Sequence, residues 1–506
     1  MDFISTHLLT TILFFPVLAG LAILFIPNDQ AKAIRWTAFL ASLVPLGLSV
    51  WLWMSFNSTA PGFQFEEQYT WYTAINSTFH LGVDGLSLSM VLLTTILTPL
   101  ALLASFSISD KVKAYMILFL LLETGMLGVF MALDLLIFFV FWEIGLVPMY
   151  FLINQWGSAN RNYASLKFFI YTMAGSLGLL LAIQMLGVLF GTYDIVALAE
   201  RWTTMEATTL LGLSTGTVKA VAFWAFVVAF AIKVPVWPFH TWLPDAHTEA
   251  PTAGSMILAG VLLKLGAYGF LRLVLPFYPQ EAAQFAGWLA FLAVMAIIFG
   301  AFGSYGQTDF KRLVAYSSIN HMGFVLLGIA AAAKAVGTLD ATIALNGAVL
   351  QMFNHGLSAA GMFFLVGVIY ERTHTRDLRQ LGGLFPLVPV YGTILIFTSM
   401  ASLGLPGLNG FVSEFLVVRG AWAIMPVYTA FAMLGLLMTG AYILKGIKQV
   451  LHGPLNEHWA HGEHRLTEIN IREILVMAPL MVLILVIGIW PMWILDVINK
   501  AMMMLF

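Results

Sequence analysis

Residues 229–272 read AFAIKVPVWPFHTWLPDAHTEAPTAGSMILAGVLLKLGAYGFLR, and this stretch decides the fold class. Lys233 and Lys264 stand there in runs so apolar that both side chains are predicted to lie in the core of a lipid bilayer. A lone cation at the bilayer centre costs about 3 kcal/mol on insertion scales, so such residues are rare and usually functional. Two acids, Glu143 and Glu414, also stand in apolar runs far from any polar loop. Acids and bases together inside a membrane indicate a path for protons or ions.

The composition is that of a polytopic membrane protein. Of 506 residues, 60% are hydrophobic and 9% are charged, whereas soluble domains carry about 25% charged residues. The chain has no cysteine, which excludes disulfides and iron–sulfur clusters or haem held by thiolates. Redox chemistry is therefore expected on other chains. The first apolar run lacks the basic region of a cleavable signal peptide and is interpreted as a retained first helix.

Apolar runs of about 20 residues predict an all-α polytopic membrane fold with about fourteen transmembrane helices. They are expected at 3–26, 36–56, 86–107, 113–132, 135–154, 166–190, 217–240, 253–275, 284–304, 312–333, 340–370, 386–422, 426–446 and 472–495. Lys and Arg concentrate in the loops after odd-numbered helices, which places those loops in the cytoplasm. Both termini are then external or periplasmic, as is segment 57–85, which contains no Lys or Arg.

Two of the expected helices are interrupted. Pro235 and Pro238 break helix seven, because a proline removes a backbone donor and clashes with the carbonyl four residues back. Pro406, between Gly404 and Gly407, breaks helix twelve. Paired interruptions in two halves of a transporter are the best sequence pointer to its site. The breaks lie five helices apart, and this odd offset predicts two inverted five-helix repeats, helices 4–8 and 9–13.

The spans divide the chain into four parts. These are 1–110 with helices one to three and the external loop 57–85, 111–275 with the first five-helix repeat, 284–450 with the inverted second five-helix repeat, and 451–506 with a cytoplasmic His-rich loop and the last helix. The repeat assignment rests on the breaks and the helix count, since no strong residue-level similarity joins the two halves.

Six ionisable residues are expected at similar depth in these helices and are the candidates for proton translocation. They are Glu143, Lys233, Lys264, His321, His355 and Glu414. Burial disfavours the charged form of each group, whereas a nearby opposite charge favours it, so a Lys–Glu pair is a two-state element. Histidine can relay a proton in either direction near neutral pH. A row of such groups would form a path parallel to the membrane plane.

Each candidate also has a structural explanation. Glu143 and Lys233 could be a static buried ion pair, and Lys264 could extend its ammonium to the membrane interface. Glu414 could belong to a helix end exposed to water. His321 and His355 could each be a histidine hydrogen-bonded between helices.

Further polar residues are possible accessories. Glu123 lies within helix four and could serve proton access or a structural bond. His240, Asp245 and His247 follow the helix-seven break and could form a polar access route or a solvated turn.

The His-rich segment 452–468, HGPLNEHWAHGEHRLTE, is the one stretch that suggests a metal site. Its spacing matches no standard zinc pattern, so no metal is predicted. The chain also lacks a P-loop, a GxGxxG after a strand and a nucleophile elbow, which argues against nucleotide binding.

Five stretches resemble the antiporter-like subunits of proton-pumping NADH:quinone oxidoreductase, respiratory complex I. They are LGVDGLSLSMVLLTT (81–95), LLETGMLGVFMALDLLIFFVFWEIGLVPMYFLI (121–153), the stretch 229–272, SSINHMGFVLLGI (317–329) and LPGLNGFVSEF (405–415). The chain is most similar to subunit M, the counterpart of mitochondrial chain 4. Glu414 distinguishes subunit M from the related antiporter-like subunits, which generally carry a lysine at this position.

The resemblance implies a role for each candidate. Glu143 and Lys233 would be the helix-five and helix-seven charge pair, and Lys264 the central relay. His321 and His355 would be further links, and Glu414 the exit residue.

The resemblance also implies partners and a location. The partners would be the L-type and N-type antiporter-like subunits, the lateral helix of subunit L, membrane lipids, and a peripheral arm with FMN, iron–sulfur clusters and quinone chemistry. The chain would be a translocase subunit in the bacterial inner membrane. The alternative is a subunit of an Mrp-type sodium/proton antiporter. A hydrogenase or formate-coupled complex and a purely structural spacer are further readings.

Overall fold

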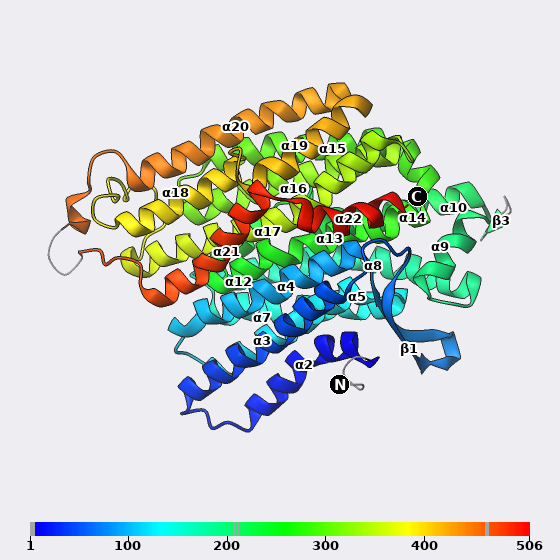
Figure 1. Cartoon of the computed structure of the whole chain (residues 1–506), viewed down its shortest axis with the longest axis horizontal. Helices are drawn as coiled ribbons and strands as arrows, with labels where there is room; N and C mark the ends of the chain where they lie inside the picture. Colours follow the sequence, from blue (N-terminus) through cyan, green and yellow to red (C-terminus); the bar gives the residue numbers. More distant parts are fainter. Residues whose placement is uncertain (1–5, 206–208, 211, 461–464, 506) are drawn as a thin grey trace.

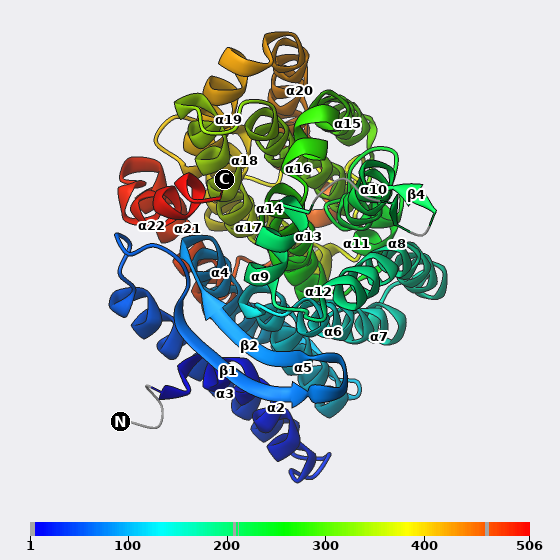
Figure 2. The ribbon, with the colours of Figure 1, turned by 90° about the vertical axis from the view of Figure 1, so that its right-hand side faces the viewer.

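The computed structural model describes residues 6–205, 209–210, 212–460 and 465–505. Most helices run along the long axis of the molecule in Figure 1. Seen from one end in Figure 2, the hairpin β1–β2 lies across the N-terminal helices, and the C-terminus lies at the same end.

Among the described residues, twelve helices are long and apolar enough to cross a membrane, and two shorter apolar helices are Leu8–Leu24 and Pro389–Leu403. The chain is therefore a mainly helical, multi-pass membrane protein.

The N-terminal part contains three helices and a β-hairpin. Its elements are α2 (Leu8–Leu24), α3 (Ala31–Ser55), β1 (Gln64–Tyr72), β2 (Ser77–Val83) and α4 (Gly85–Ala104). The strands pair antiparallel, with Glu67 opposite Leu81, so the predicted loop 57–85 is partly β-structure and the fold is not purely helical. Asn76 turns the chain with φ of 59°, a left-handed conformation that asparagine adopts more readily than most residues.

The hairpin also caps the first helix. The Glu67 carboxylate is buried and accepts hydrogen bonds from the Leu9 N–H at 2.7 Å and the Thr10 N–H at 3.3 Å. These amides belong to the first turn of α2, where no intrahelical acceptor exists.

The next part carries the first interruption. Its elements are α5 (Val112–Met131), α6 (Leu135–Ile144), α7 (Leu146–Trp156), α8 (Arg161–Phe190), α9 (Ile195–Thr203), the short strands β3 (Thr209–Leu210) and β4 (Leu213–Ser214), α10 (Thr215–Lys233), α11 (Trp242–Glu249), α12 (Thr252–Ile257), α13 (Leu263–Gly269) and α14 (Leu275–Phe277). Pro235 and Pro238 lie between α10 and α11. Two π-helical turns, Leu258–Leu262 and Phe270–Val274, join α12, α13 and α14.

The remaining part carries the second interruption. Its elements are α15 (Pro279–Gly306), α16 (Phe310–Lys334), α17 (Leu339–Thr373), α18 (Pro389–Leu403), α19 (Asn409–Ile424), α20 (Pro426–Leu451), α21 (Ile471–Ile489) and α22 (Met492–Met503). Between α18 and α19, Gly404 and Gly407 take φ of 85° and 93° around Pro406, a region that glycine enters without steric penalty.

A histidine joins the hairpin to α9. His80 Nδ1 lies 2.9 Å from Asp194 Oδ2, and Nε2 lies 3.0 Å from Glu66 Oε2. Burial lowers the pKa of His80, but the two carboxylates raise it by more, so the pKa is above its usual 6.5. Burial raises the pKa of Asp194, whereas His80 and the Ala197 N–H lower it by more, to a net value below 3.8.

The stability of this contact is therefore expected to depend on pH. Because the pKa of His80 is raised in the folded protein, its contribution to folding stability is complete below pH 6.5 and is lost as the pH rises through the folded pKa. Because the pKa of Asp194 is lowered, its contribution is complete above pH 3.8 and is lost as the pH falls through the folded pKa. Hydrogen-exchange protection of the β2 amides, corrected for intrinsic rates, should be higher at about pH 5.5 than at about pH 8.5. In His80→Asn this difference should disappear. Equal protection at both pH values in the native chain would contradict the assignment.

Candidate functional site

Lys233 ends α10 inside the protein. Its side chain is 2% exposed, and its Nζ lies 5.0 Å from the centroid of the Trp142 ring and 6.0 Å from that of Phe168. An ammonium over an aromatic face is stabilised by the ring's electron density. The two rings therefore hold the cation at the place where α10 ends.

Glu143 lies next to Trp142, near the end of α6. Pro148 explains why the helix is interrupted here, because a proline clashes with the carbonyl four residues earlier, that of Ile144. Within the described chain, no nitrogen–oxygen contact of 4.0 Å or less joins Glu143 to Lys233, although their charges interact. The pair is thus close without being a formed salt bridge.

Lys264 is fully buried and makes two hydrogen bonds. Its Nζ donates to the Ala259 carbonyl at 2.5 Å and to His355 Nδ1 at 2.7 Å. Ala259 lies in the first π turn, where widened hydrogen bonding changes which carbonyls are free, and such turns occur frequently at functional sites. An ammonium extended to the membrane interface, the structural alternative for Lys264, does not fit this burial.

A glycine in α17 lets this helix approach the first π turn next to His355. A Cβ on Gly356 would lie 2.9 Å from the Gly260 carbonyl, closer than real Cβ atoms lie, whereas one on Gly260 would lie at an ordinary 3.6 Å from the Gly356 carbonyl. Gly356 is therefore the residue whose missing side chain allows this approach.

The second cluster joins α16, α17 and α19. His321 Nδ1 lies 2.8 Å from Glu414 Oε1, and Gln351 donates to the same oxygen at 3.0 Å. Glu414 is 4% exposed, so it does not lie at a helix end open to water. The His321 and His355 ring centroids are 5.5 Å apart. Lys264, His355, His321 and Glu414 therefore form a continuous series.

A small cavity lies between the two histidines and the second helix break. Its volume is about 10 Å³, and it is lined by His321, His355, Ser402 and Glu414, among others. A cavity of this size with several polar neighbours is at the lower limit for one water molecule. Glu414 Oε2 has no hydrogen-bond partner among the described residues.

The possible accessories have different surroundings. Glu123 is fully buried, and neither carboxylate oxygen has a partner within the described part of the chain. Asp245 binds Lys167 at 2.7 Å and Arg312 at 3.2 Å. His247 stacks on Phe363 at 4.4 Å. His240 lies before α11, and its ring centroid is 6.4 Å from that of Tyr316. The segment 242–249 is a largely buried helix, so it is not a solvated turn.

Sequence reasoning did not single out three of the groups near this site. Lys311 lies one residue before the helix expected at 312–333, but it is buried in α16 and donates to the Ala250 carbonyl. Gln351 and Tyr442 contact Glu414 and His321. Of these three groups, only Gln351 had a signal in the sequence. It lies four residues before His355 and therefore on the same face of the helix as that predicted site residue.

The His-rich segment lies partly outside the described residues, which include neither His461 nor His464. In the described ranges, no group of three His, Cys, Asp or Glu side chains could hold a metal ion.

The fold and the buried series of lysines, histidines and acids define a multi-pass membrane protein of the antiporter-like class. Residues 132–439 match the family model described as NADH:quinone oxidoreductase/Mrp antiporter, TM, and the chain belongs to this family.

The relatives are subunits of one enzyme. NADH-quinone oxidoreductase subunit M of Rhodobacter capsulatus is 39% identical, over 98% of this chain and 95% of that protein. The same subunit of Pseudomonas aeruginosa is 39% identical, over 98% and 96%. The predicted similarity to subunit M is confirmed.

Solved structures of two membrane complexes contain chains with the same fold. A chain of respiratory complex I from Thermus thermophilus with bound NADH matches with a TM-score of 0.84 and 27% identity, over 98% of this chain and 99% of that chain. A chain of the Mrp complex from Dietzia sp. matches with a TM-score of 0.83 at 21% identity, over 98% and 97%, which shows the shared fold. Membership in a multi-subunit membrane complex of the complex I type is supported.

Proposed function

We propose that the chain is a proton-translocating subunit of NADH:quinone oxidoreductase that moves protons from the cytoplasm to the outside. The observation that carries this proposal is the buried series from Lys264 through His355 and His321 to Glu414. Each outer pair is joined by a direct hydrogen bond, and both rings line a cavity at the lower size limit for one water molecule.

The hydrogen bonds define how a proton would move. Lysine only donates, so His355 Nδ1 is the acceptor, and its Nε2, 3.2 Å from Ser318 Oγ, carries the proton of the neutral ring. A proton passed from Lys264 to Nδ1 makes an imidazolium, which releases its other proton from Nε2. His321 then receives a proton and donates from Nδ1 to the Glu414 carboxylate.

Glu143 and Lys233 would control this transfer electrostatically. While Glu143 is ionised, it favours the charged form of Lys233; when Glu143 is neutralised or moves away, burial favours release of the lysine proton. The absence of a formed salt bridge in the described chain supports a pair that can change its separation. Electron transfer in other subunits would drive that change.

The same proposal assigns cofactors to partner subunits, names the neighbouring subunits and gives the membrane topology. We place FMN, iron–sulfur clusters and quinone on partner subunits, with no redox chemistry on this chain. The L-type and N-type subunits and the lateral helix of subunit L would be its neighbours. The chain would cross the inner membrane fourteen times as two inverted repeats, with both termini external.

The test is Glu143→Gln in the whole complex, assayed in inverted membrane vesicles. NADH-driven proton uptake should fall at least about tenfold, because a positioned ionisable group is removed. The matched control is Glu200→Gln on exposed α9, which should pump normally. Assembly is checked on native gels.

Other outcomes would change the assignment. Unchanged NADH-driven pumping with loss of sodium/proton exchange would move the chain to the Mrp-type antiporters. If an assembled Glu143→Gln complex changes neither activity, Glu143 is structural.

A further inference from the structure

A second set of polar side chains extends from Lys264 toward the end of the molecule that carries the hairpin. Tyr268 and Arg272 follow Lys264 at intervals of four residues, so all three lie near one face of the helical segment. The Tyr268 hydroxyl donates to the Phe130 carbonyl at 3.0 Å and lies 3.0 Å from Ser87 Oγ. Arg272 Nε donates to the same hydroxyl at 3.1 Å. The residues are therefore linked to one another beyond Lys264.

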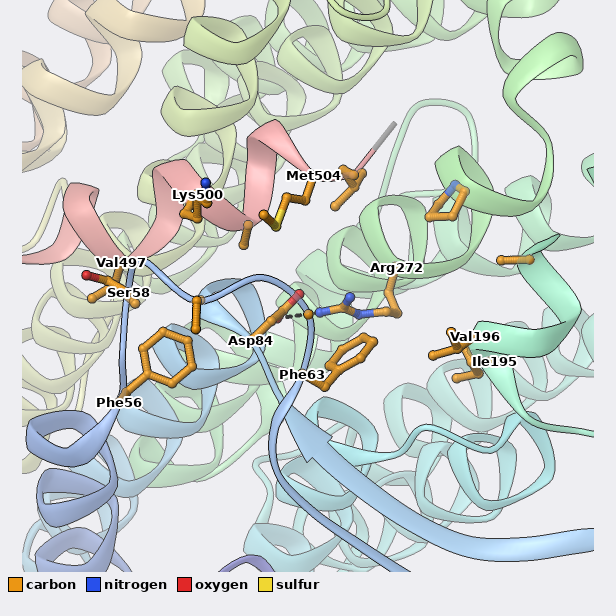
Figure 3. A pocket seen from close by; sticks show the side chains of 17 residues that line it. Phe56, Ser58, Phe63, Asp84, Ile195, Val196, Arg272, Val497, Lys500 and Met504 are labelled. Carbon is orange, nitrogen blue, oxygen red and sulfur yellow. Dashed lines mark hydrogen bonds and ion pairs between the residues drawn. The ribbon is translucent and has the colours of Figure 1, made fainter.

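An ion pair closes this set. Arg272 Nη2 lies 2.5 Å from Asp84 Oδ1, and the guanidinium carbon lies 4.8 Å from the centroid of the Phe63 ring (Figure 3). The side chains are 7% and 13% exposed. Asp84 is fixed in turn, because its Oδ1 accepts the Ser87 N–H and caps α4. The pair is thus held on both sides by the fold.

A cavity reaches the outer side of this ion pair. Its volume is about 200 Å³, and its lining includes Asp84, Arg272 and Lys500 as well as Val196 and Met504 (Figure 3). Val196 and Met504 are 50% and 44% exposed, so the cavity is at the surface. At about 30 Å³ per molecule in the liquid, such a space accommodates several waters. Water from this end can therefore approach as far as the guanidinium.

We propose that the Arg272–Asp84 pair is an electrostatic barrier that separates this external cavity from Lys264. An arginine side chain keeps its proton in proteins and cannot relay one. Asp84 offsets part of its charge, but the guanidinium still places a permanent cation between the cavity and Tyr268, and arginines act in this way in pores that exclude protons. The inference rests on the proposed function, because it confines the proton on Lys264 to the route through His355. Arg272 is a positioning residue in this scheme.

The first test replaces the charge. Arg272→Met keeps an unbranched stem and removes the guanidinium, and it is compared with Arg419→Met, which makes the same change in an exposed pair with Asp340. The purified whole complex is reconstituted in proteoliposomes, and the collapse of a pH gradient is followed after NADH is exhausted. Collapse should be at least about tenfold faster in Arg272→Met than in Arg419→Met, because the repulsive charge is gone. Arg272→Lys retains a cation and should remain close to native.

An assembled Arg272→Met complex with native proton leakage would overturn the proposal. The second test does not depend on that variant. The chain contains no cysteine, so single cysteines can be introduced at Val196 in the cavity and at Ser87 behind the ion pair. A membrane-impermeant maleimide is added from outside, and labelling of this chain is measured by mass.

Val196→Cys should be labelled, and Ser87→Cys should be protected. Equal labelling of the two positions would mean that water passes the ion pair, and the barrier would not exist. This result is separable from the proposed function. Native proton uptake in an assembled Lys264→Met complex together with a protected Ser87→Cys would reject the proposed proton route and leave the barrier in place.

Discussion

Lys264→Met in the whole complex is expected to reduce NADH-driven proton uptake by about a hundredfold, the low end of what a positioned acid–base group contributes. The series of buried proton-carrying groups begins at Lys264. Its Nζ donates hydrogen bonds to His355 Nδ1 at 2.7 Å and to the Ala259 carbonyl at 2.5 Å. Methionine fills nearly the same volume and has no proton to transfer. The loss should therefore appear in proton uptake, measured in inverted vesicles, while the complex still assembles.

The matched control is Lys334→Met. Lys334 ends α16 and is exposed, so the same chemical change there should leave pumping unchanged. Native proton uptake in an assembled Lys264→Met complex would show that the route bypasses Lys264 and that His355 serves packing.

The second large effect is expected from Gly410→Ala. Gly410 lies at the start of α19, and a Cβ there would overlap the Ala401 carbonyl in the last turn of α18. The backbone cannot yield as a side chain would, so the two helices must separate. Forced overpacking of this kind costs about 1–3 kcal/mol. The thermal midpoint and yield of the purified complex should both fall, and α19 should carry Glu414 away from His321.

Gly440→Ala should act in the opposite direction. Among the described residues, no atom outside the local helix backbone lies within 4 Å of a Cβ built at Gly440 on α20. Alanine in a helix interior is favoured over glycine by about 0.5–1 kcal/mol. A Gly410→Ala complex as stable as Gly440→Ala would mean that the break between α18 and α19 adjusts freely.

The helices and their interruptions could be predicted because they depend on local sequence. Apolar runs set the spans, and prolines at 235, 238 and 406 lie where helices α10 and α18 have ended. The burial of Lys264, His321 and Glu414 was predictable as well, since each lies within an apolar run.

Contacts between distant segments could not be predicted in the same way. The contact of Gly260 in the first π turn with Gly356 in α17 joins residues far apart in the sequence, and no local pattern encodes it. The predicted Glu143–Lys233 pair is close, yet within the described chain it is not a formed salt bridge. Lys311 falls just outside the helix expected at 312–333, and its burial against the Ala250 carbonyl depends on a segment about 60 residues earlier in the chain.

The capping of α2 by Glu67 bears on how the protein is made. The acceptor for the Leu9 and Thr10 amides lies 58 and 57 residues further along the chain. A ribosome must therefore synthesise α3 and β1 before the first helix can complete its end. Until then those amides depend on water, which keeps the start of α2 at the membrane surface. The capping of the first helix is thus completed only when the hairpin that carries Glu67 has formed.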